Sequence, residues 1–346
     1  MCQYSAQDGF ANDWHFVHLG SRAQGGAGLV IMEAAAVVPE GRISPGDLGI
    51  WKDEHIPGLK RIVSFLHSQG VRAGIQLAHA GRKGSRSVPF TGERLLLPAE
   101  GGWPTVGPSA LAFGPGYSQP KPLSPVGLAA IPQAFAQAAQ RALAAHFDFI
   151  EIHAAHGYLL HQFLSPLSNR RTDTFGGSFR NRTRLLLQVV DAVRAAWPTH
   201  LPLFVRISAT DWVDEGWTVD ESVELSCLFR EHGVDLVDVS SGGLHPSARI
   251  PVGPGFQVRF AGRIKREAGM PTAAVGLISD AAQANAIVAQ GEADLVLLGR
   301  KFLRDPYWPL HAAVALGEPA SWPVQYLRAA PHGSPERASV NRPEEG

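Results

Sequence analysis

Short apolar runs alternate with longer amphipathic segments along most of the chain. Continuous aliphatic runs are typical of strands buried on both faces, and apolar residues at a period of about 3.6 predict helices. The predicted strands are Gly28–Glu33, Ala73–Leu77, Phe147–His153, Leu203–Ser208, Asp235–Ser240, Thr272–Gly276 and Asp294–Gly299. The predicted helices are Trp14–Gln24, Ile56–Gln69, Ile131–His146, Asn181–Trp197, Asp220–His232, Gln257–Glu267, Ala281–Gln290 and Tyr307–Leu316.

This alternation predicts an α/β fold in which helices cover both faces of a parallel sheet. Because the alternation is unbroken, it favours a (β/α)8 TIM barrel over an open doubly wound sheet. The pattern has eight helices but seven strands, and it opens on a loop that leads into a helix. A closed barrel needs a strand before its first helix. We therefore expect a barrel whose first strand is missing or truncated. If the strand is truncated, Met1 and Cys2 are its end.

Two segments fall outside the repeat. An insertion around residues 79–130 is rich in Gly, Pro and Ser, and loops of such length are usually functional lids or disordered. Trp103, Phe113 and Tyr117 within it favour an ordered lid at the mouth of a site. Residues 329–346 are polar and contain Pro, so we expect a disordered tail there. Residues 1–328 are expected to form a single domain.

Composition narrows the class of protein. A chain of 346 residues with 45% hydrophobic content can bury a large core. Its 31 basic and 31 acidic residues include no basic block, which argues against nucleic-acid binding. Cys2 and Cys227 are its only cysteines, so it has neither a disulfide framework nor a zinc-type cysteine pair. Without a signal-peptide pattern or a membrane-length apolar run, we expect a cytoplasmic protein with no membrane partner.

The most informative segment is FDFIEIHAAHGY, residues 147–158. Its apolar run ends at His153, where α/β folds build their sites, and His156 and Tyr158 follow on the next turn. Two imidazole donors and a phenol can bind a carbonyl oxygen and protonate a neighbouring carbon. We predict a catalytic site there, with a strand end that carries incidental polar residues as the alternative.

Other polar residues and glycines also lie at predicted strand ends. Gly276 and Gly299 end the last two strands, where many barrels hold a phosphate on bare backbone N–H groups, and Arg300 adds a guanidinium. Each glycine could also be only a turn.

Gln76 and Arg206 also lie near strand ends. A guanidinium is costly to bury unpaired, so Arg206 binds an anionic or electron-rich ligand or forms an ion pair with an acid such as Asp211. The Gln76 amide offers a donor and an acceptor to a heteroaromatic ring, although it could equally be structural.

Together these features suit a flavin mononucleotide, FMN. The rival is a zinc or two-metal hydrolase, because His79, His153 and His156 are available. Metal sites commonly use carboxylates, whereas these strand ends offer glutamine, arginine and glycine, and a buried cation would repel a metal. We therefore expect no metal.

Several long segments carry a resemblance to a known family. They include the motifs HAAHGYL at 153–159 and LSPLSNRRTDTFGGS at 164–178. The matching segments are Met1–Ser5, Glu33–Trp51, Gly74–Lys83, Phe147–Arg182, Leu203–Trp212, Asp238–Gly243 and Leu297–Trp308. In these segments the chain resembles the old yellow enzyme family of FMN-dependent ene-reductases, in particular its thermophilic-like branch.

The resemblance implies a function and a set of site residues. NADPH would reduce FMN and leave, and an α,β-unsaturated carbonyl or nitro compound would then take the hydride at its β-carbon, in a ping-pong mechanism. His153 and His156 would hold the carbonyl oxygen, Tyr158 would protonate the α-carbon, and Tyr4 would touch the substrate. The implied FMN contacts are Met1, Cys2, Ala34, Gln76, Arg206, Gly276, Gly299 and Arg300. The branch also implies a homo-oligomer, a dimer or tetramer, in which Arg328 reaches a neighbouring site.

The chain departs from the family at its start. Family members begin earlier, with a strand that ends in Ser-Pro or a similar pair just before Met-Cys and lines the flavin. Either Met1 is an internal methionine of a longer protein, or this form is truncated. We expect the 346-residue chain to bind FMN poorly or to aggregate. A flavin-poor or catalytically dead barrel that acts as a binding module is therefore the alternative function.

Overall fold

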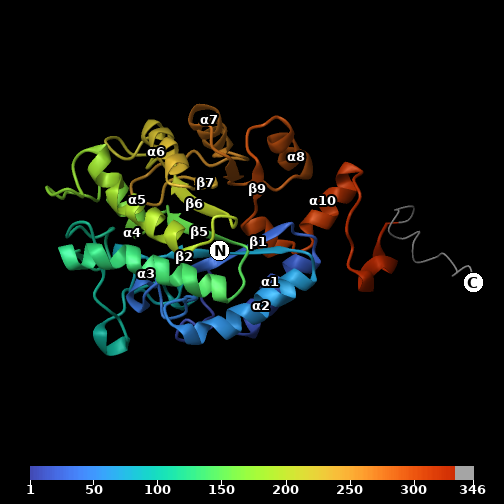
Figure 1. Ribbon diagram of the computed structural model, residues 1–346, viewed down its shortest axis with the longest axis horizontal. Coiled ribbons are helices and arrows are strands. Elements are labelled where there is room, and N and C mark those ends of the chain that lie inside the picture. Colours follow the sequence, from blue (N-terminus) through green and yellow to red (C-terminus); the bar gives the residue numbers. More distant parts are fainter. Residues whose placement is uncertain (332–346) are drawn as a thin grey trace, which may run out of the picture.

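Seven parallel strands form one curled sheet in the computed structural model, which describes residues 1–331 (Figure 1). Their order in the sheet follows the chain, and every neighbouring pair is parallel. They are β1 (Leu29–Ala36), β2 (Arg72–Ala78), β5 (Phe149–Ala154), β6 (Leu203–Ser208), β7 (Leu236–Ser240), β8 (Thr272–Val275) and β9 (Leu295–Leu297). This confirms the α/β TIM-barrel fold class. Among the described strands β1 and β9 do not pair with each other, so the barrel is open between them.

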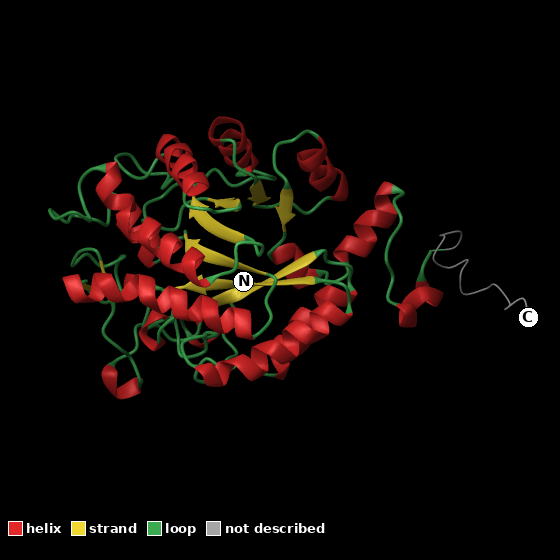
Figure 2. Ribbon diagram, in the orientation of Figure 1, coloured by secondary structure: helices red, strands yellow, loops and turns green. Residues whose placement is uncertain are grey.

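Helices surround the outside of this sheet (Figure 2). They are α1 (Asp13–Gln24), α2 (Ile56–Ser68), α3 (Pro125–Ala144), α4 (Leu159–Leu164), α5 (Phe179–Ala196), α6 (Val219–Glu231), α7 (Val258–Ala268), α8 (Ala281–Ala289), α9 (Arg300–Arg304) and α10 (Trp308–Leu316). Helix α3 starts earlier than the predicted Ile131, because Ser124 caps it by accepting the Gly127 N–H and Pro125 occupies its first turn. The short helices α4 and α9 were not predicted. None of the described helices is both long and apolar enough to span a bilayer.

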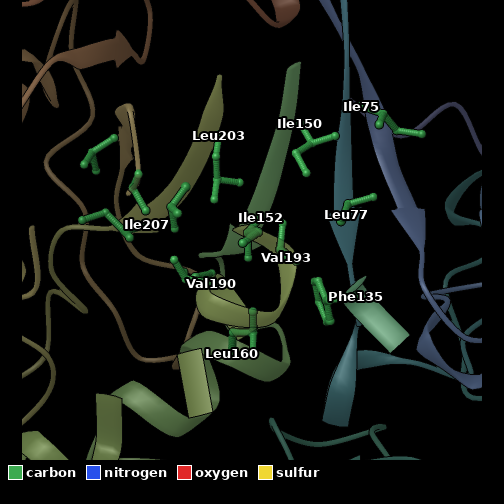
Figure 3. Close-up of a cluster of buried hydrophobic side chains, with 14 of the residues drawn as sticks. Ile75, Leu77, Phe135, Ile150, Ile152, Leu160, Val190, Val193, Leu203 and Ile207 are labelled. Atoms are coloured by element: carbon green, nitrogen blue, oxygen red, sulfur yellow. The ribbon is translucent and has the colours of Figure 1, made fainter. Parts of the chain in front are cut away.

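The main core lies between the sheet and its helices. Figure 3 shows Ile150 and Ile152 of β5 packed with residues of β2, β6 and the surrounding helices. Every residue of β5 is buried. Burying a side chain of this size contributes roughly 1.5–3 kcal/mol. Because side chains alternate along a strand, Glu151 and His153 point to the opposite face, into the barrel.

A second, smaller hydrophobic cluster fills the barrel interior at the end where the strands begin. It comprises Phe149, Phe204, Leu236 and Ala273 from four adjacent strands. Gly74 makes room for it, because a Cβ there would lie 2.2 Å from the Phe149 ring. Apolar side chains therefore close the barrel at the end where the strands begin, and polar side chains occupy the end where the strands finish.

The insertion after β2 carries little regular structure. It contains η3 (Gly81–Lys83), η4 (Pro89–Thr91), η5 (Pro98–Glu100) and the paired strands β3 (Val106–Gly107) and β4 (Lys121–Pro122). Buried Arg86 donates to the carbonyl oxygens of Gly116 and Glu93 and so ties distant parts of the insertion together. The predicted disordered tail lies outside the described residues from residue 332 onward.

Candidate active site

The end of β5 brings His153, His156 and Tyr158 together. The His153 ring centroid lies 5.1 Å from that of His156 and 5.0 Å from that of Tyr158. Both ring pairs are close to perpendicular, at 90° and 80°. The edges of all three rings can therefore approach one small ligand.

His153 presents a free donor. Its Nδ1 accepts the Ala155 N–H at 3.3 Å, so in the neutral ring the proton sits on Nε2. No described residue accepts a hydrogen bond from Nε2. Burial, and then the positive charge of Arg206, hold the His153 pKa well below its ordinary value. The ring therefore stays neutral and keeps one N–H for a ligand.

His156 is held more tightly than the sequence suggested. Its φ is +58°, its backbone N–H donates to the Ser208 hydroxyl at 2.9 Å, and its Nε2 lies 2.7 Å from the Ser240 hydroxyl. Burial lowers its pKa as well. We expected an N–H of both rings to be free for a ligand, but Nε2 of His156 is engaged by Ser240, so its Nδ1 is the nitrogen without a partner among the described residues.

Tyr158 precedes α4 and lines a cavity together with Ala34, Ala36 and Asp47. Its hydroxyl has no hydrogen-bond partner among the described residues. Burial, and then the neighbouring Cys2, raise the Tyr158 pKa well above its ordinary value, so the phenol remains protonated. The structure thus brings Ala34 and the N-terminal segment next to this phenol.

The N-terminal segment is anchored by buried groups. The Gln3 N–H donates to Glu33 Oε2 at 2.7 Å. Burial raises the pKa of both the Cys2 thiol and the Tyr4 hydroxyl, and Tyr4 adopts a φ of +50°. Met1 lies against Gly299, since a Cβ on that glycine would be 3.1 Å from the Met1 sulfur.

Below His153, two polar side chains face the barrel interior. Gln76 Nε2 donates to Glu151 Oε1 at 2.7 Å, which leaves the Gln76 oxygen free to accept. Arg206 Nε lies 3.1 Å from Asp238 Oδ2, and its terminal nitrogens have no partner in the described chain. We named Asp211 as a partner for Arg206; that was wrong, because the neighbouring strand places Asp238 opposite Arg206.

These free groups test whether FMN fits. The unpaired groups that face the interior are the terminal N–H groups of Arg206 and the oxygen of Gln76. Gln76 pairs with Glu151 in the register of β2 and β5, and His153 stands opposite Arg206 in that of β5 and β6, so both groups lie on one stretch of the inner wall. A flat ring system with alternating donors and acceptors on its edge matches this set. The residues present therefore fit the isoalloxazine ring of FMN.

The predicted phosphate residues follow β8 and the edge strand β9. Gly276 has a φ of +122°, and a Cβ there would be 2.7 Å from Gln257 Nε2. Gly299 precedes α9, and the exposed Arg300 guanidinium has no partner among the described residues. Arg328 is exposed in η6 (Val324–Ala329), which lies beyond α10 and away from the sheet (Figure 1). The structure therefore does not bring Arg328 to the histidines of its own chain.

Sequence reasoning missed Lys83. Its ammonium donates to the carbonyl oxygens of His156 at 2.8 Å and Gly243 at 2.6 Å, and it lies 4.1 Å from the centroid of Phe113 in the insertion. Burial lowers its pKa to about 7. Lys83 thus joins the ends of β5 and β7 to the predicted lid. A basic pair shortly after a strand, Arg82-Lys83, was the only available signal.

The loops after β5 and β7 also approach each other directly. Gly243 has a φ of +87°, and a Cβ there would lie 2.7 Å from the His156 Cα. On the other side, the Gly157 N–H donates to His161 Nδ1 at 2.9 Å, and His161 Nε2 lies 3.0 Å from Asp211. The strained backbone of His156 is therefore fixed from both sides by buried contacts.

Known proteins that are similar to this chain are oxidoreductases. A family model described as "NADH:flavin oxidoreductase / NADH oxidase family" matches residues 1–317. An NADPH dehydrogenase of Geobacillus thermodenitrificans (strain NG80-2) is 50% identical over 330 residues, which cover 95% of this chain and 92% of that protein. An NADPH dehydrogenase of Listeria innocua is 47% identical over 95% of this chain and 93% of its own.

Two solved structures are similar as well. Morphinone reductase in complex with tetrahydroNAD matches with a TM-score of 0.76 and 27% identity over 93% of this chain and 86% of its own. A 2-naphthoyl-CoA reductase complex matches with a TM-score of 0.80 and 26% identity, over 91% of this chain and 49% of its own.

Proposed function

Because the chain belongs to the NADH:flavin oxidoreductase / NADH oxidase family, we propose that it is an ene-reductase that uses FMN and NADPH. It reduces the activated C=C bond of α,β-unsaturated carbonyl or nitro compounds. When bound, FMN supplies hydride chemistry that no amino-acid side chain has. The protein binds and orients the reactants.

One observation supports the substrate class above all: the free N–H of His153 beside His156 and Tyr158. Hydride addition to an enone builds negative charge on the carbonyl oxygen. A neutral, preset imidazole donor stabilises that charge, and loss of one such donor typically costs about 10²–10³ in rate. The Ser240 hydroxyl donates to Nε2 of His156 and fixes its ring, so that the proton sits on Nδ1, which donates to the same oxygen.

Tyr158 completes the reaction by giving its hydroxyl proton to the α-carbon. A phenol with a raised pKa is a weak acid, but the receiving carbon is strongly basic at that point. Tyr4 lies close enough to influence Tyr158 electrostatically and is our candidate for a further substrate contact. Because one set of donors, His153 and His156, serves both reactants, NADPH and the enone use the site in turn, which is a ping-pong mechanism.

The remaining candidates are proposed to hold FMN. Gln76 and Arg206 bind the ring edge, and Met1, Cys2 and Ala34 pack beside it. Gly276, Gly299 and Arg300 bind the phosphate through backbone N–H groups and one guanidinium. Arg328 is proposed to enter a neighbouring site in a homo-oligomer.

Purified protein and an anaerobic spectrum test the proposal. NADPH should bleach the yellow flavin absorbance, and 2-cyclohexenone should then restore it. Failure of NADPH to bleach the flavin would support the binding-module alternative. Bleaching followed by no reoxidation with cyclohexenone, a maleimide or a nitroalkene would overturn the substrate class. The FMN content of the same sample decides whether this 346-residue chain binds its cofactor poorly.

A further inference from the structure

Three charged groups meet in the middle of the barrel wall. They are Glu151 of β5, Arg206 of β6 and Asp238 of β7, and Arg206 stands opposite Asp238 in the strand register. Both carboxyl groups have 0% exposure. The neighbouring strands add no charge, since β2 contributes the neutral amide of Gln76 and β8 places Ala273 opposite Asp238. Two buried acids therefore share one cation.

The hydrogen bonds around these acids are incomplete. Gln76 donates to one oxygen of Glu151, and Arg206 Nε approaches one oxygen of Asp238 at 3.1 Å. Within the described residues, Glu151 Oε2 and both oxygens of Asp238 are sealed from solvent and have no hydrogen-bond donor, since Arg206 Nε forms an ion pair with Asp238 without hydrogen-bond geometry. Strand β6 lies between β5 and β7, so the two carboxyl groups flank Arg206 inside the barrel, and each is close enough to affect the pKa of the other. Two ionised carboxylates cannot satisfy each other, because each can only accept.

A single proton resolves both problems. It turns one carboxyl group into a donor for the other, and it reduces the net charge of the cluster from minus one to zero. Buried acids that share a site normally take up a proton in preference to carrying two charges. We propose that Glu151 and Asp238 share one proton, so that the protein holds a proton-storing site directly beneath His153 and Arg206.

The electrostatics agree in direction. Burial, and then the charge of Asp238, raise the Glu151 pKa to about 8, and burial raises the Asp238 pKa as well. The other titratable groups nearest the cluster, His153 and His156, stay neutral and add no charge. The stored proton is therefore retained through neutral pH and released in alkaline solution.

The proton also controls the charge that faces the cofactor, a consequence that rests on the proposed function. With the proton in place, one negative charge balances the positive charge of Arg206, and the cluster is neutral. After the proton leaves, the cluster is negative and opposes the addition of negative charge to a ring bound at Arg206. As the pH rises through the range in which this proton is released, the midpoint potential of bound FMN should therefore fall more steeply.

Infrared spectroscopy of the purified protein tests the proton itself. The wild type should show the C=O band of a buried carboxylic acid, which shifts in D₂O and disappears at alkaline pH. Glu151→Gln should abolish it, because the variant has no acid to protonate at this position. The glutamine still accepts from Gln76 and donates to Asp238, as the protonated acid does. Asp238→Asn should abolish it too, because Glu151 then pairs with Arg206 alone.

Asp211→Asn is the matched control. Although burial acts to raise the Asp211 pKa, His161 lowers it overall, so Asp211 is already ionised and its replacement should leave the band unchanged. Absence of the band in the wild type, or its survival in Asp238→Asn, would overturn the proposal. Potentiometry of the FMN-loaded protein is the second measurement: the wild type should show the steeper segment, and Glu151→Gln should not. Loss of FMN binding would count against the proposed function only, because the infrared test does not depend on it.

Discussion

The central strands and the edge strands of the sheet differ sharply. Strands β5 and β7 are buried along their whole length and are paired on both sides, and they carry or adjoin His153, Ser240 and Asp238. Strand β9 has three residues, all partly exposed, and has a partner on one side only among the described strands. It leads directly into Gly299 and Arg300.

The candidate substrate site and the candidate phosphate site are therefore built differently. The candidate substrate groups are locked by neighbours before any ligand arrives, which is the arrangement that stabilises developing charge most effectively. The candidate phosphate groups are backbone N–H groups and one exposed guanidinium on a short edge. We expect single changes in the centre to have large effects and single changes at the edge to have small ones.

The largest effect is expected for His153→Ala. Removal of the preset N–H should lower the rate of flavin reoxidation by cyclohexenone about 10²–10³-fold, while FMN content is unchanged. Flavin reduction by NADPH should change much less, because that step builds no charge on a carbonyl oxygen. Stopped-flow measurement of the two half-reactions checks this. His200→Ala, an exposed histidine, is the control, and equal losses in both half-reactions would contradict the assigned role.

The next effect concerns the contact between the two central loops. Gly243→Ala places a Cβ 2.7 Å from the His156 Cα at a φ of +87°, and such strain costs about 1–3 kcal/mol. Thermal or urea unfolding should reveal the loss, together with reduced enone turnover. Gly253→Ala is the matched control, since nothing lies within 4 Å of its Cβ position. Equal stability of the two variants would show that the loops are not interlocked.

These loops mark the limit of what the sequence could predict. The strands and long helices follow from hydrophobic periodicity, and the motif after β5 identified the histidines and the tyrosine. The partner of Arg206 could not be predicted from the sequence, because it is set by the strand register, which places Asp238 opposite Arg206 and not the sequence neighbour Asp211. Lys83 was missed because its partners are carbonyl groups of two other loops. Such contacts depend on tertiary structure and leave no periodic signal.

The third effect is a pH dependence of the buried centre. Glu151 has a pKa of about 8 in the folded protein, against an ordinary 4.5, so folding takes up a proton between these values. Wild-type stability is therefore lost as pH rises through this window, with a slope of at most about 1.4 kcal/mol per pH unit. Glu151→Gln should lack this loss and gain relative stability toward pH 8. Parallel stability curves for the two proteins would exclude a raised pKa at Glu151.

The smallest effect is expected at the edge, for Arg300→Ala. The guanidinium is exposed and unpaired among the described residues, so its contact with a phosphate is screened by water and contributes no more than about 1 kcal/mol. The Kd for FMN should rise about fivefold, and the effect should shrink at high salt because exposed charges are screened. Flavin fluorescence titration of the apoprotein measures it. Arg304→Ala, at the other end of the same short helix, is the matched control and should bind FMN as the wild type does. If Arg300→Ala instead abolished FMN binding, the edge would be as preorganised as the centre, and the contrast between the two regions would not hold.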